Sequence, residues 1–527
     1  MPARLPLLLL LACIVVGFAN LIPPLKPAFI VAVVTCAGLG LFFHSLKPAA
    51  AQAMVTRVCV AAVGMPLLAW ALPSVWLLYF AMLVWIPLLA GRTGNVAPVY
   101  LYTLLLLPGL DTTAAIGSIK LFDIGVHDAL GLGAATALLV STGKGRTRPA
   151  LDLPVAALIL MFTFVFARGT SITNTVRVAI DMGLDYGLPY YIVSRGIRSI
   201  EEAQRTQLWL ACGAITLASI LTYEAWTAWP IYNELYNHYS LSTLLLVKLR
   251  GGILRAGGPF VEPTSAAMIL GMCIFALWLS RDFFRSKWHH VLVMGASLVG
   301  LAAPQSRGAW IGLMLAIAAA LFFRRRYFTL ARWSAVLAAI GVLLYTLAQN
   351  SPTLAESIGL TGNSADTSEY RRDLLSRGME EFWKKPLSGY SMPDLLIAMD
   401  DMKQGEGIVD FVNTYLWIML VAGAFGVFLF AGTFIYFLVR LLPLRRPIPD
   451  FPQSITVATF AFGALIMPFE MLFFTSFGGR VAFFVFGLFG FTAALVTIRE
   501  RERRKRRAVR SITVPAQGDG AELVLQT

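Results

Sequence analysis

The sequence predicts an all-α, polytopic membrane protein, built as a bundle of transmembrane helices. Of its 527 residues, 57% are hydrophobic and only 14% are charged, and the mean hydropathy is +0.71. Apolar stretches of about 20 residues, the length that crosses the hydrocarbon core of a bilayer, recur along nearly the whole chain. A soluble domain cannot bury that much apolar surface, so the soluble classes are excluded.

Sixteen apolar segments can be delimited along the chain, and about 14–16 of them are expected to span the membrane. They cover approximately 5–22, 27–45, 55–72, 74–90, 96–110, 124–142, 151–168, 178–194, 206–225, 264–280, 288–303, 308–323, 330–348, 410–440, 453–473 and 479–498. The fifth is short for a crossing. Segment 410–440 is long enough to contain a short helix that breaks at Gly423 before a full crossing.

The distribution of cations predicts the orientation. Eight lysines and arginines lie between Arg499 and Arg510, directly after the last apolar segment. The positive-inside rule puts this tail in the cytoplasm, and counting the segments backwards puts both termini there. The net charge of +14 therefore reflects anchoring to the bilayer, and we expect no nucleic-acid partner.

Two long polar segments fall on the opposite, external side of the predicted transmembrane domain (residues 1–498). They are a first external loop over 226–262 and a long external loop over 349–409, while 499–527 form the basic cytoplasmic tail. Apolar residues at helical spacing before Pro386 predict an amphipathic helix in the long loop. Its cations Arg371, Arg372 and Arg377 either bind an anion or form the solvated face of a peripheral helix.

Two further arginines lie at the external ends of predicted spans. Arg255 follows Gly251 and Gly252, and glycine permits positive φ or the close approach of a ligand. Arg307 lies between two spans that are joined by almost no loop. Because a buried arginine costs about 2.5–3.5 kcal/mol on insertion scales, a functional or paired role is expected. The alternatives are contact with lipid headgroups or an ion pair with Glu262.

The order of these motifs resembles the O-antigen ligase and polymerase superfamily of bacterial cell envelopes. The resemblance covers about 240–440 and rests on an ordered set of short motifs. The set comprises Arg255 in a glycine-rich loop, Ser306-Arg307-Gly308 at a span start, an arginine-containing loop helix ending in Pro386-Leu387-Ser388-Gly389-Tyr390, then Asn413-Thr414-Tyr415-Leu416 and Ala422-Gly423-Ala424-Phe425-Gly426.

The resemblance implies a fold of the C-type glycosyltransferase kind and glycosyl transfer at the outer face of the bacterial inner membrane. It implies an undecaprenyl-pyrophosphate-linked oligosaccharide as substrate and the lipid bilayer as surroundings, with no metal or other cofactor. A copolymerase that regulates chain length is a candidate partner. The sequence agrees on metals, because it contains no HxxxH, DxD or CxxC spacing.

The resemblance also suggests which residues hold the substrate. A pyrophosphate leaving group gains charge as the glycosidic bond breaks, and fixed guanidinium groups can accept that charge in a bidentate fashion. Binding of the pyrophosphate or glycan is therefore expected from Arg255, Arg307, Arg371, Arg372, Arg480, Asn413 and Tyr415. For Arg480, an ion pair with Glu470 is the alternative.

One position departs from the family pattern. Ligases of this family usually carry a histidine immediately before the asparagine of their His-Asn pair, and here that position is Val412. Glu262 and Asp410 are the candidate catalytic residues that remain, with His238 as another imidazole. Asp410 can instead be a helix N-terminal charge, and His238 a solvated loop residue.

The missing histidine favours a polysaccharide polymerase over an O-antigen ligase that transfers to a lipid or protein acceptor. A lipid-linked oligosaccharide transporter is the alternative from another class. Long external loops with clustered arginines favour the enzyme, because a transporter would place its ionisable groups near the midplane and show two related halves.

Overall fold

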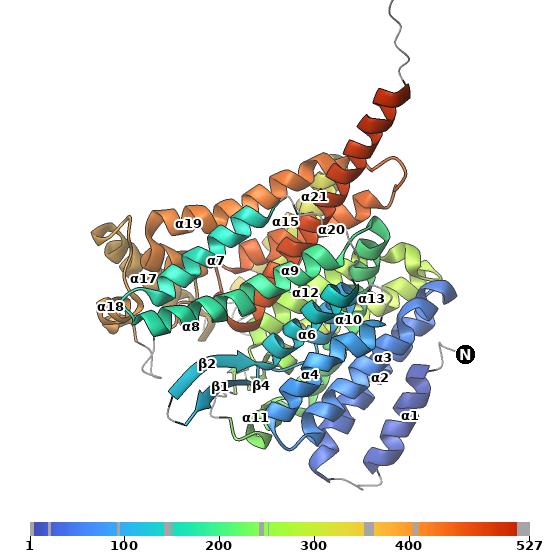
Figure 1. The fold of residues 1–527 in the computed structure, drawn as a ribbon, viewed down its shortest axis with the longest axis horizontal. Coiled ribbons are helices and arrows are strands. Elements are labelled where there is room, and N and C mark those ends of the chain that lie inside the picture. Colours follow the sequence, from blue (N-terminus) through green and yellow to red (C-terminus); the bar gives the residue numbers. More distant parts are fainter. Residues whose placement is uncertain are drawn as a thin grey trace, which may run out of the picture.

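A computed structural model describes residues 5–18, 23–91, 95–117, 119–141, 149, 151–241, 247–250, 252–351, 363–403 and 409–513. Figure 1 shows a bundle of helices with two small β-hairpins at one side. The helices are α1 (Leu5–Phe18), α2 (Lys26–Ser45), α3 (Pro48–Ala71), α4 (Val75–Ala90), α5 (Val96–Leu104), α6 (Val126–Ser141), α7 (Asp152–Ala167), α8 (Ile172–Met182), α9 (Leu188–Gly196), α10 (Ile200–Thr227), α11 (Asn233–His238), α12 (Pro263–Leu279), α13 (Lys287–Ala302), α14 (Arg307–Phe323), α15 (Tyr327–Gln349), α17 (Asn363–Lys384), α18 (Met392–Ala398), α19 (Thr414–Leu441), α20 (Ser454–Met471) and α21 (Gly479–Thr513). The strands are β1 (Asp111–Ile116), β2 (Ile119–Gly125), β3 (Leu249–Arg250) and β4 (Ile253–Leu254).

The predicted all-α polytopic bundle is confirmed. Each of the sixteen predicted apolar segments coincides with a helix or, at 178–194, with consecutive helical segments. Within the described residues, seven helices are long and apolar enough to cross a membrane: α2, α3, α10, α15, α19, α20 and α21. Six shorter apolar helices accompany them. The chain is therefore a multi-pass membrane protein, while the total of 14–16 spans stays a prediction.

Two segments differ from their predicted bounds. At 96–110 the helix α5 ends at Leu104, and the irregular stretch after it is buried inside the bundle, where protein and not lipid surrounds its backbone. At 178–194 the helix begins earlier, at Ile172, and continues through a π-helical turn at Gly183–Gly187 into α9. Hydropathy missed the start of α8 because its first residues are polar.

The two β-hairpins were not predicted from the sequence. Strand β1 pairs with β2 in antiparallel fashion, with an irregularity between Ala114 and Ala115. Arg177 of α8 covers β2 by donating Nε to Leu121 O at 2.8 Å. Figure 1 shows this hairpin, α11, α17 and α18 away from the end where α21 leaves the bundle.

The core of the bundle lies around α21, whose apolar part is almost completely buried. This helix packs against α9, α19 and α20. Aromatic rings fill the contact: Phe489 lies 4.9 Å from Phe434 and 4.7 Å from Phe437 between ring centroids. By contrast, nearly all side chains of α15 are exposed, as expected for a helix surrounded by lipid tails.

The predicted break in α19 is confirmed at Gly423. This residue has φ 68° and ψ −170°, so the helix is interrupted there and resumes. A β-carbon at Gly423 would collide with the carbonyl oxygen of Leu387, which leaves glycine as the residue that fits. The interruption frees backbone groups near the membrane, and such groups need partners.

The backbone of the loop after α17 supplies those partners. Ala424 N donates to Pro386 O at 2.9 Å, and Tyr390 N donates to Leu420 O at 2.7 Å. Arg168, directly after α7, donates Nη1 to Ser388 O at 2.6 Å. Its Nη2 donates to Val421 O, two residues before Gly423, at 3.1 Å. The loop that follows α17 is therefore joined to the backbone of α19, which brings the two sequence motifs together in space.

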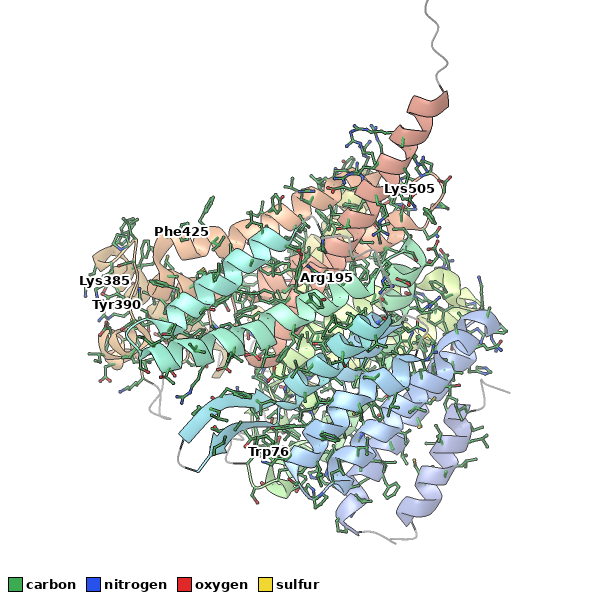
Figure 2. All side chains as sticks on the ribbon, in the orientation of Figure 1. Trp76, Arg195, Lys385, Tyr390, Phe425 and Lys505 are labelled. Carbon is green, nitrogen blue, oxygen red and sulfur yellow. The ribbon has the colours of Figure 1, made fainter. Side chains whose placement is uncertain are left out.

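Side chains hold α17 to the same loop. The Glu381 side chain is only 3% exposed and accepts hydrogen bonds from Tyr390 Oη at 2.8 Å, from Lys384 Nζ at 2.7 Å and from Arg377. Burial alone would raise the pKa of Glu381, but these hydrogen bonds outweigh it and lower that pKa to about 2. Figure 2 shows Lys385 and Tyr390 together at this end of the molecule, 4.4 Å from Nζ to ring centroid.

The break gives a test of this arrangement. Gly423→Ala should destabilise the protein by roughly 1–3 kcal/mol or more, because alanine disfavours φ 68° and its β-carbon meets the loop backbone. Gly432→Ala in the same helix is the control, since an added β-carbon there meets no atom within 4 Å. Thermal unfolding of purified protein measures both. Equal melting temperatures for the two variants would contradict the assigned role of Gly423.

Candidate functional site

A polar cavity of about 420 Å³ lies where the two predicted external loops meet the helix ends. Six chain segments surround it: the β3–β4 region, the start of α12, the start of α14, α17, the residues before α19, and the end of α20 with the residues that follow it. Its lining residues are Lys248, Arg250, Arg255, Glu262, Thr264, Gln305, Ser306, Arg307, Gly308, Ile311, Arg371, Asp410, Val412, Met471, Phe474, Thr475 and Ser476. Five of the nine residues expected from the sequence to form the site therefore lie around one cavity.

Three of the cations come from one short hairpin. Strands β3 and β4 are antiparallel, and Gly252 between them has φ 75°, which favours glycine in the turn. Just outside the strands, Arg255 N donates to Lys248 O at 2.9 Å. Side chains two residues apart on a strand point to the same side, so Lys248 and Arg250 reach the cavity together.

The hairpin arginines are held by neutral acceptors. Arg250 Nη1 donates to Gln305 O at 2.8 Å, and Arg255 Nε donates to Pro304 O at 3.0 Å. Both acceptors belong to the turn before α14, where Gln305 has φ 52°. A carbonyl orients a guanidinium but leaves its charge uncompensated. Among the residues that the structure describes, neither arginine forms an ion pair.

The N-terminus of α14 contributes Arg307 and Gly308. A cation in the first turn of a helix lies at the positive end of the helix dipole, which costs about 0.3–1 kcal/mol at an exposed site. That position is therefore unfavourable for folding alone. It is favourable for an anion, which meets the guanidinium and the helix end together.

Arg371 approaches the cavity from the other predicted external loop. It donates Nη2 to Phe474 O at 3.4 Å, and its guanidinium lies 6.0 Å from the ring centroid of the same phenylalanine. Its Nε is buried and has no hydrogen-bond partner in the described part of the chain. A buried donor without a partner is costly, so a ligand that accepts from it would be stabilised.

The cations influence one another electrostatically. Burial lowers the pKa of Arg255, and the charges of Arg250 and Arg371 lower it further, while Glu262 opposes them. Burial likewise lowers the pKa of Arg371, and the charge of Arg250 lowers it further, while the charge of Asp410 raises it. Both guanidinium groups stay protonated at neutral pH. The site therefore concentrates positive charge before any ligand binds.

Two carboxylates lie among these cations. Glu262 is the N-cap of α12: its Oε2 accepts from Ser265 N at 2.5 Å, and its Oε1 lies 3.9 Å from Lys248 Nζ. Asp410 precedes α19, and its backbone carbonyl accepts from Tyr370 Oη of α17 at 3.2 Å. Both residues line the cavity.

Residues 292–431 match a family model described as O-antigen ligase. This confirms the predicted resemblance to the O-antigen ligase and polymerase superfamily, and it indicates a glycosyltransferase-type enzyme of the membrane. No curated protein matches the chain.

The matched segment, residues 292–431, supplies only part of the cavity. The match begins in α13 and ends in α19, so it includes Arg307, Arg371 and Asp410. The β3–β4 cations and Glu262 precede it in sequence. The cavity is completed where the first predicted external loop packs against the matched segment, through the hydrogen bonds to Pro304 and Gln305.

The other four expected substrate residues do not line this cavity. Arg372 is exposed on α17 beside Arg371. Asn413 caps α19 by accepting from Leu416 N at 3.1 Å. Tyr415 is buried, donates to Phe469 O at 2.7 Å, and stacks on Phe473 at 4.2 Å. The contacts of Asn413 and Tyr415 hold the start of α19 and the end of α20 in place beside the cavity.

Arg480 lies in a different environment. It donates Nη2 to Tyr236 Oη at 2.9 Å and packs against Gly109, where a β-carbon would come within 2.6 Å of the guanidinium. In the described part of the chain it forms no ion pair with Glu470, so that alternative is wrong. The tyrosine in turn donates to Gly109 O at 2.6 Å, which joins α11 to the segment after α5.

Three contributors were missed from the sequence. Lys248 and Arg250 precede Arg255 on the hairpin, and their spacing of two was the available signal. Glu224 near the end of α10 is buried, and its Oε2 accepts from Gly258 N at 2.7 Å, which fixes the glycine-rich loop. A single glutamate in an apolar segment gave no sign of that contact.

The cavity predicts unequal roles for two adjacent arginines. Arg371→Ala, Arg255→Ala and Arg307→Ala should each lower turnover by about 10²–10³, the scale of losing one preorganised donor to a developing charge. Arg372→Ala, which removes the same charge outside the cavity, should lower it far less. Turnover is measured on protein shown to be inserted and folded. Equal losses at 371 and 372 would mean that general loop charge, and not the cavity, matters.

Proposed function

We propose that this protein is a bacterial cell-surface polysaccharide polymerase. It transfers a glycan from an undecaprenyl-pyrophosphate carrier to another carrier-linked repeat unit at the outer face of the inner membrane. The observation that carries the proposal is the cavity that unites Lys248, Arg250, Arg255, Arg307 and Arg371 with two carboxylates at the ends of membrane helices. The O-antigen ligase family match supports the same class of reaction.

The charge of the cavity suits the donor. A pyrophosphate diester carries two negative charges, and backbone carbonyls already orient the guanidinium groups of Arg250 and Arg255 before it arrives. Arginine can take phosphate oxygens in a bidentate fashion, which a lysine cannot. Ile311 and Met471 give the cavity an apolar side at the ends of α14 and α20, next to which the polyprenyl chain can enter the bilayer.

The proposed reaction is a displacement at the anomeric carbon of the donor glycan. An acceptor hydroxyl oxygen forms the new bond to that carbon, while the bond from the carbon to the pyrophosphate oxygen breaks with its electron pair. The arginines stabilise the charge that develops on the departing pyrophosphate. Glu262 or Asp410 receives the proton of the hydroxyl, as a general base.

The choice of polymerase over ligase rests on Val412. This residue occupies the position of the ligase histidine and lines the cavity, so the imidazole is replaced at the site by an apolar side chain. No histidine is among the lining residues that the structure describes. Transfer to a lipid or protein acceptor is the second candidate, and the name of the matched family favours it.

The same proposal sets the surroundings of the enzyme. Both termini face the cytoplasm, as the basic tail predicts, and the segments 226–262 and 349–409 face the periplasm. The reaction needs no metal, since fixed guanidinium groups supply the positive charge. A chain-length-regulating copolymerase is a proposed partner.

Sizing the products of a purified reaction tests the function. Protein reconstituted with an undecaprenyl-pyrophosphate-linked repeat unit should yield a ladder of longer carrier-linked glycans, and a chelator should leave the rate unchanged. A single transfer that occurs only after addition of a lipid or protein acceptor would identify a ligase. Movement of intact donor across the membrane without any new bond would identify a transporter and overturn the proposal.

The identity of the base gives a separate prediction. Loss of a general base lowers turnover by about 10²–10⁴. Either Glu262→Gln or Asp410→Asn should show that loss together with a changed acidic limb of the pH profile. Asp400→Asn is the control, because Asp400 is exposed on the long predicted external loop, does not line the cavity and pairs with Lys403. If both variants keep full rate and the same acidic limb, departure of the leaving group assisted by arginine alone becomes the mechanism.

A further inference from the structure

A second hollow lies at the other end of the molecule, where α21 leaves the bundle. It has a volume of about 730 Å³ and lies between α21 and the loop that joins α19 to α20. Its lining residues are Pro443, Arg446, Pro447, Ile448, Pro449, Arg499, Glu502, Arg503, Lys505, Arg506 and Arg507. Figure 2 shows Lys505 at this end, beside the projecting part of α21.

This hollow, the C-terminal cleft, is strongly cationic. Six of its lining side chains are lysine or arginine, against one carboxylate, Glu502. Lys505 pairs with Glu502 at 2.8 Å, and Arg506 pairs with Asp450 of the facing loop at 2.5 Å. Among the described residues, the other four cations of the cleft form no ion pair. Excess positive charge therefore remains after the internal pairs are formed.

The cleft is also partly apolar and lies at the membrane boundary. Arg499 directly follows the buried apolar part of α21, which ends at Ile498. The facing loop contributes Ile448, fixed by a 2.9 Å hydrogen bond from its N–H to Ser454 Oγ, and three prolines that limit the backbone. An anion that is attached to an apolar chain meets both kinds of surface here.

We propose that the C-terminal cleft binds the phosphodiester headgroup of an anionic phospholipid, with the first part of the lipid chains against the loop prolines and Ile448. Phosphate-bearing ligands in general fit the charge, but the position at the end of a membrane span and the apolar side favour a lipid. Basic pockets of this kind between membrane helices suit anionic lipid headgroups. Lipid binding here would hold α21 against the α19–α20 loop.

The test uses the full-length protein in a zwitterionic detergent. Melting temperature is followed by tryptophan fluorescence against increasing concentrations of short-chain phosphatidylglycerol, phosphatidylcholine of equal chain length, or inorganic phosphate at equal ionic strength. Phosphatidylglycerol should raise the melting temperature in a saturable manner, because a ligand that binds the folded state stabilises it. The other two additives should not.

Charge-matched variants locate the effect. Arg446→Gln/Arg503→Gln removes two cations of the cleft, and Lys287→Gln/Arg504→Gln removes two exposed cations that do not line it. The first pair should weaken the apparent affinity for phosphatidylglycerol about thirtyfold, at roughly one factor of five to six per cation. The second pair should leave it within about twofold.

Three results would overturn the proposal. The first is an equal loss of affinity for phosphatidylglycerol in both double variants, which indicates attraction by overall charge. The second is an unchanged rise in melting temperature in the cleft variant. The third is a rise with inorganic phosphate as large as the rise with phosphatidylglycerol. If the cleft double variant does not fold, Arg507→Gln alone must weaken the affinity about fivefold. The comparison of the three additives on the unaltered protein needs no variant.

Discussion

The backbone interruption at Gly423 is the constraint on which the rest of the candidate site depends. A helix broken near the membrane must satisfy its freed backbone groups inside the protein. Here the loop after α17 does so: Pro386 O accepts from the helix after the break, and Tyr390 N donates to the helix before it. Arg168 also donates to the carbonyl of Val421. The position of α17, and therefore of Arg371 over the cavity, follows from these hydrogen bonds.

The opposite side of the cavity uses the same kind of support. The β3–β4 hairpin is joined to the turn before α14 by guanidinium-to-carbonyl hydrogen bonds, and Glu224 fixes the glycine-rich loop from below. Neutral acceptors hold the cations in place without neutralising them. This arrangement costs folding energy through mutual repulsion, and a bound polyanion would recover it.

The two ends of the molecule concentrate positive charge in different ways. In the cavity, the arginines come from three segments that are distant in sequence, and backbone carbonyls accept from Arg250, Arg255 and Arg371. In the C-terminal cleft, most cations come from one continuous stretch of α21, and two of them are held by carboxylates. The first arrangement suits one ligand in a defined geometry, whereas the second suits a headgroup at the bilayer surface.

The sequence by itself determined the apolar helices, the approximate bounds of most of them and the break in α19. Hydropathy is a local property, and Gly423 interrupts an apolar run too long for one crossing. The sequence also predicted roles for Arg255 and Arg307 from their place at span ends, and for Arg371 from its place on the predicted loop helix. Glu262 and Asp410 were the candidate bases because Val412 occupies the position of the family histidine.

Only the tertiary structure decided which of these residues share a cavity. Arg371 and Arg372 are neighbours in sequence, yet helix geometry turns one toward the cavity and the other to the surface. Arg250 and Lys248 reach the cavity from a two-stranded hairpin that is too short to predict. Arg480 donates a hydrogen bond to Tyr236 and does not line the cavity. Such contacts join segments up to 244 residues apart, and no local pattern encodes a pairing over that separation.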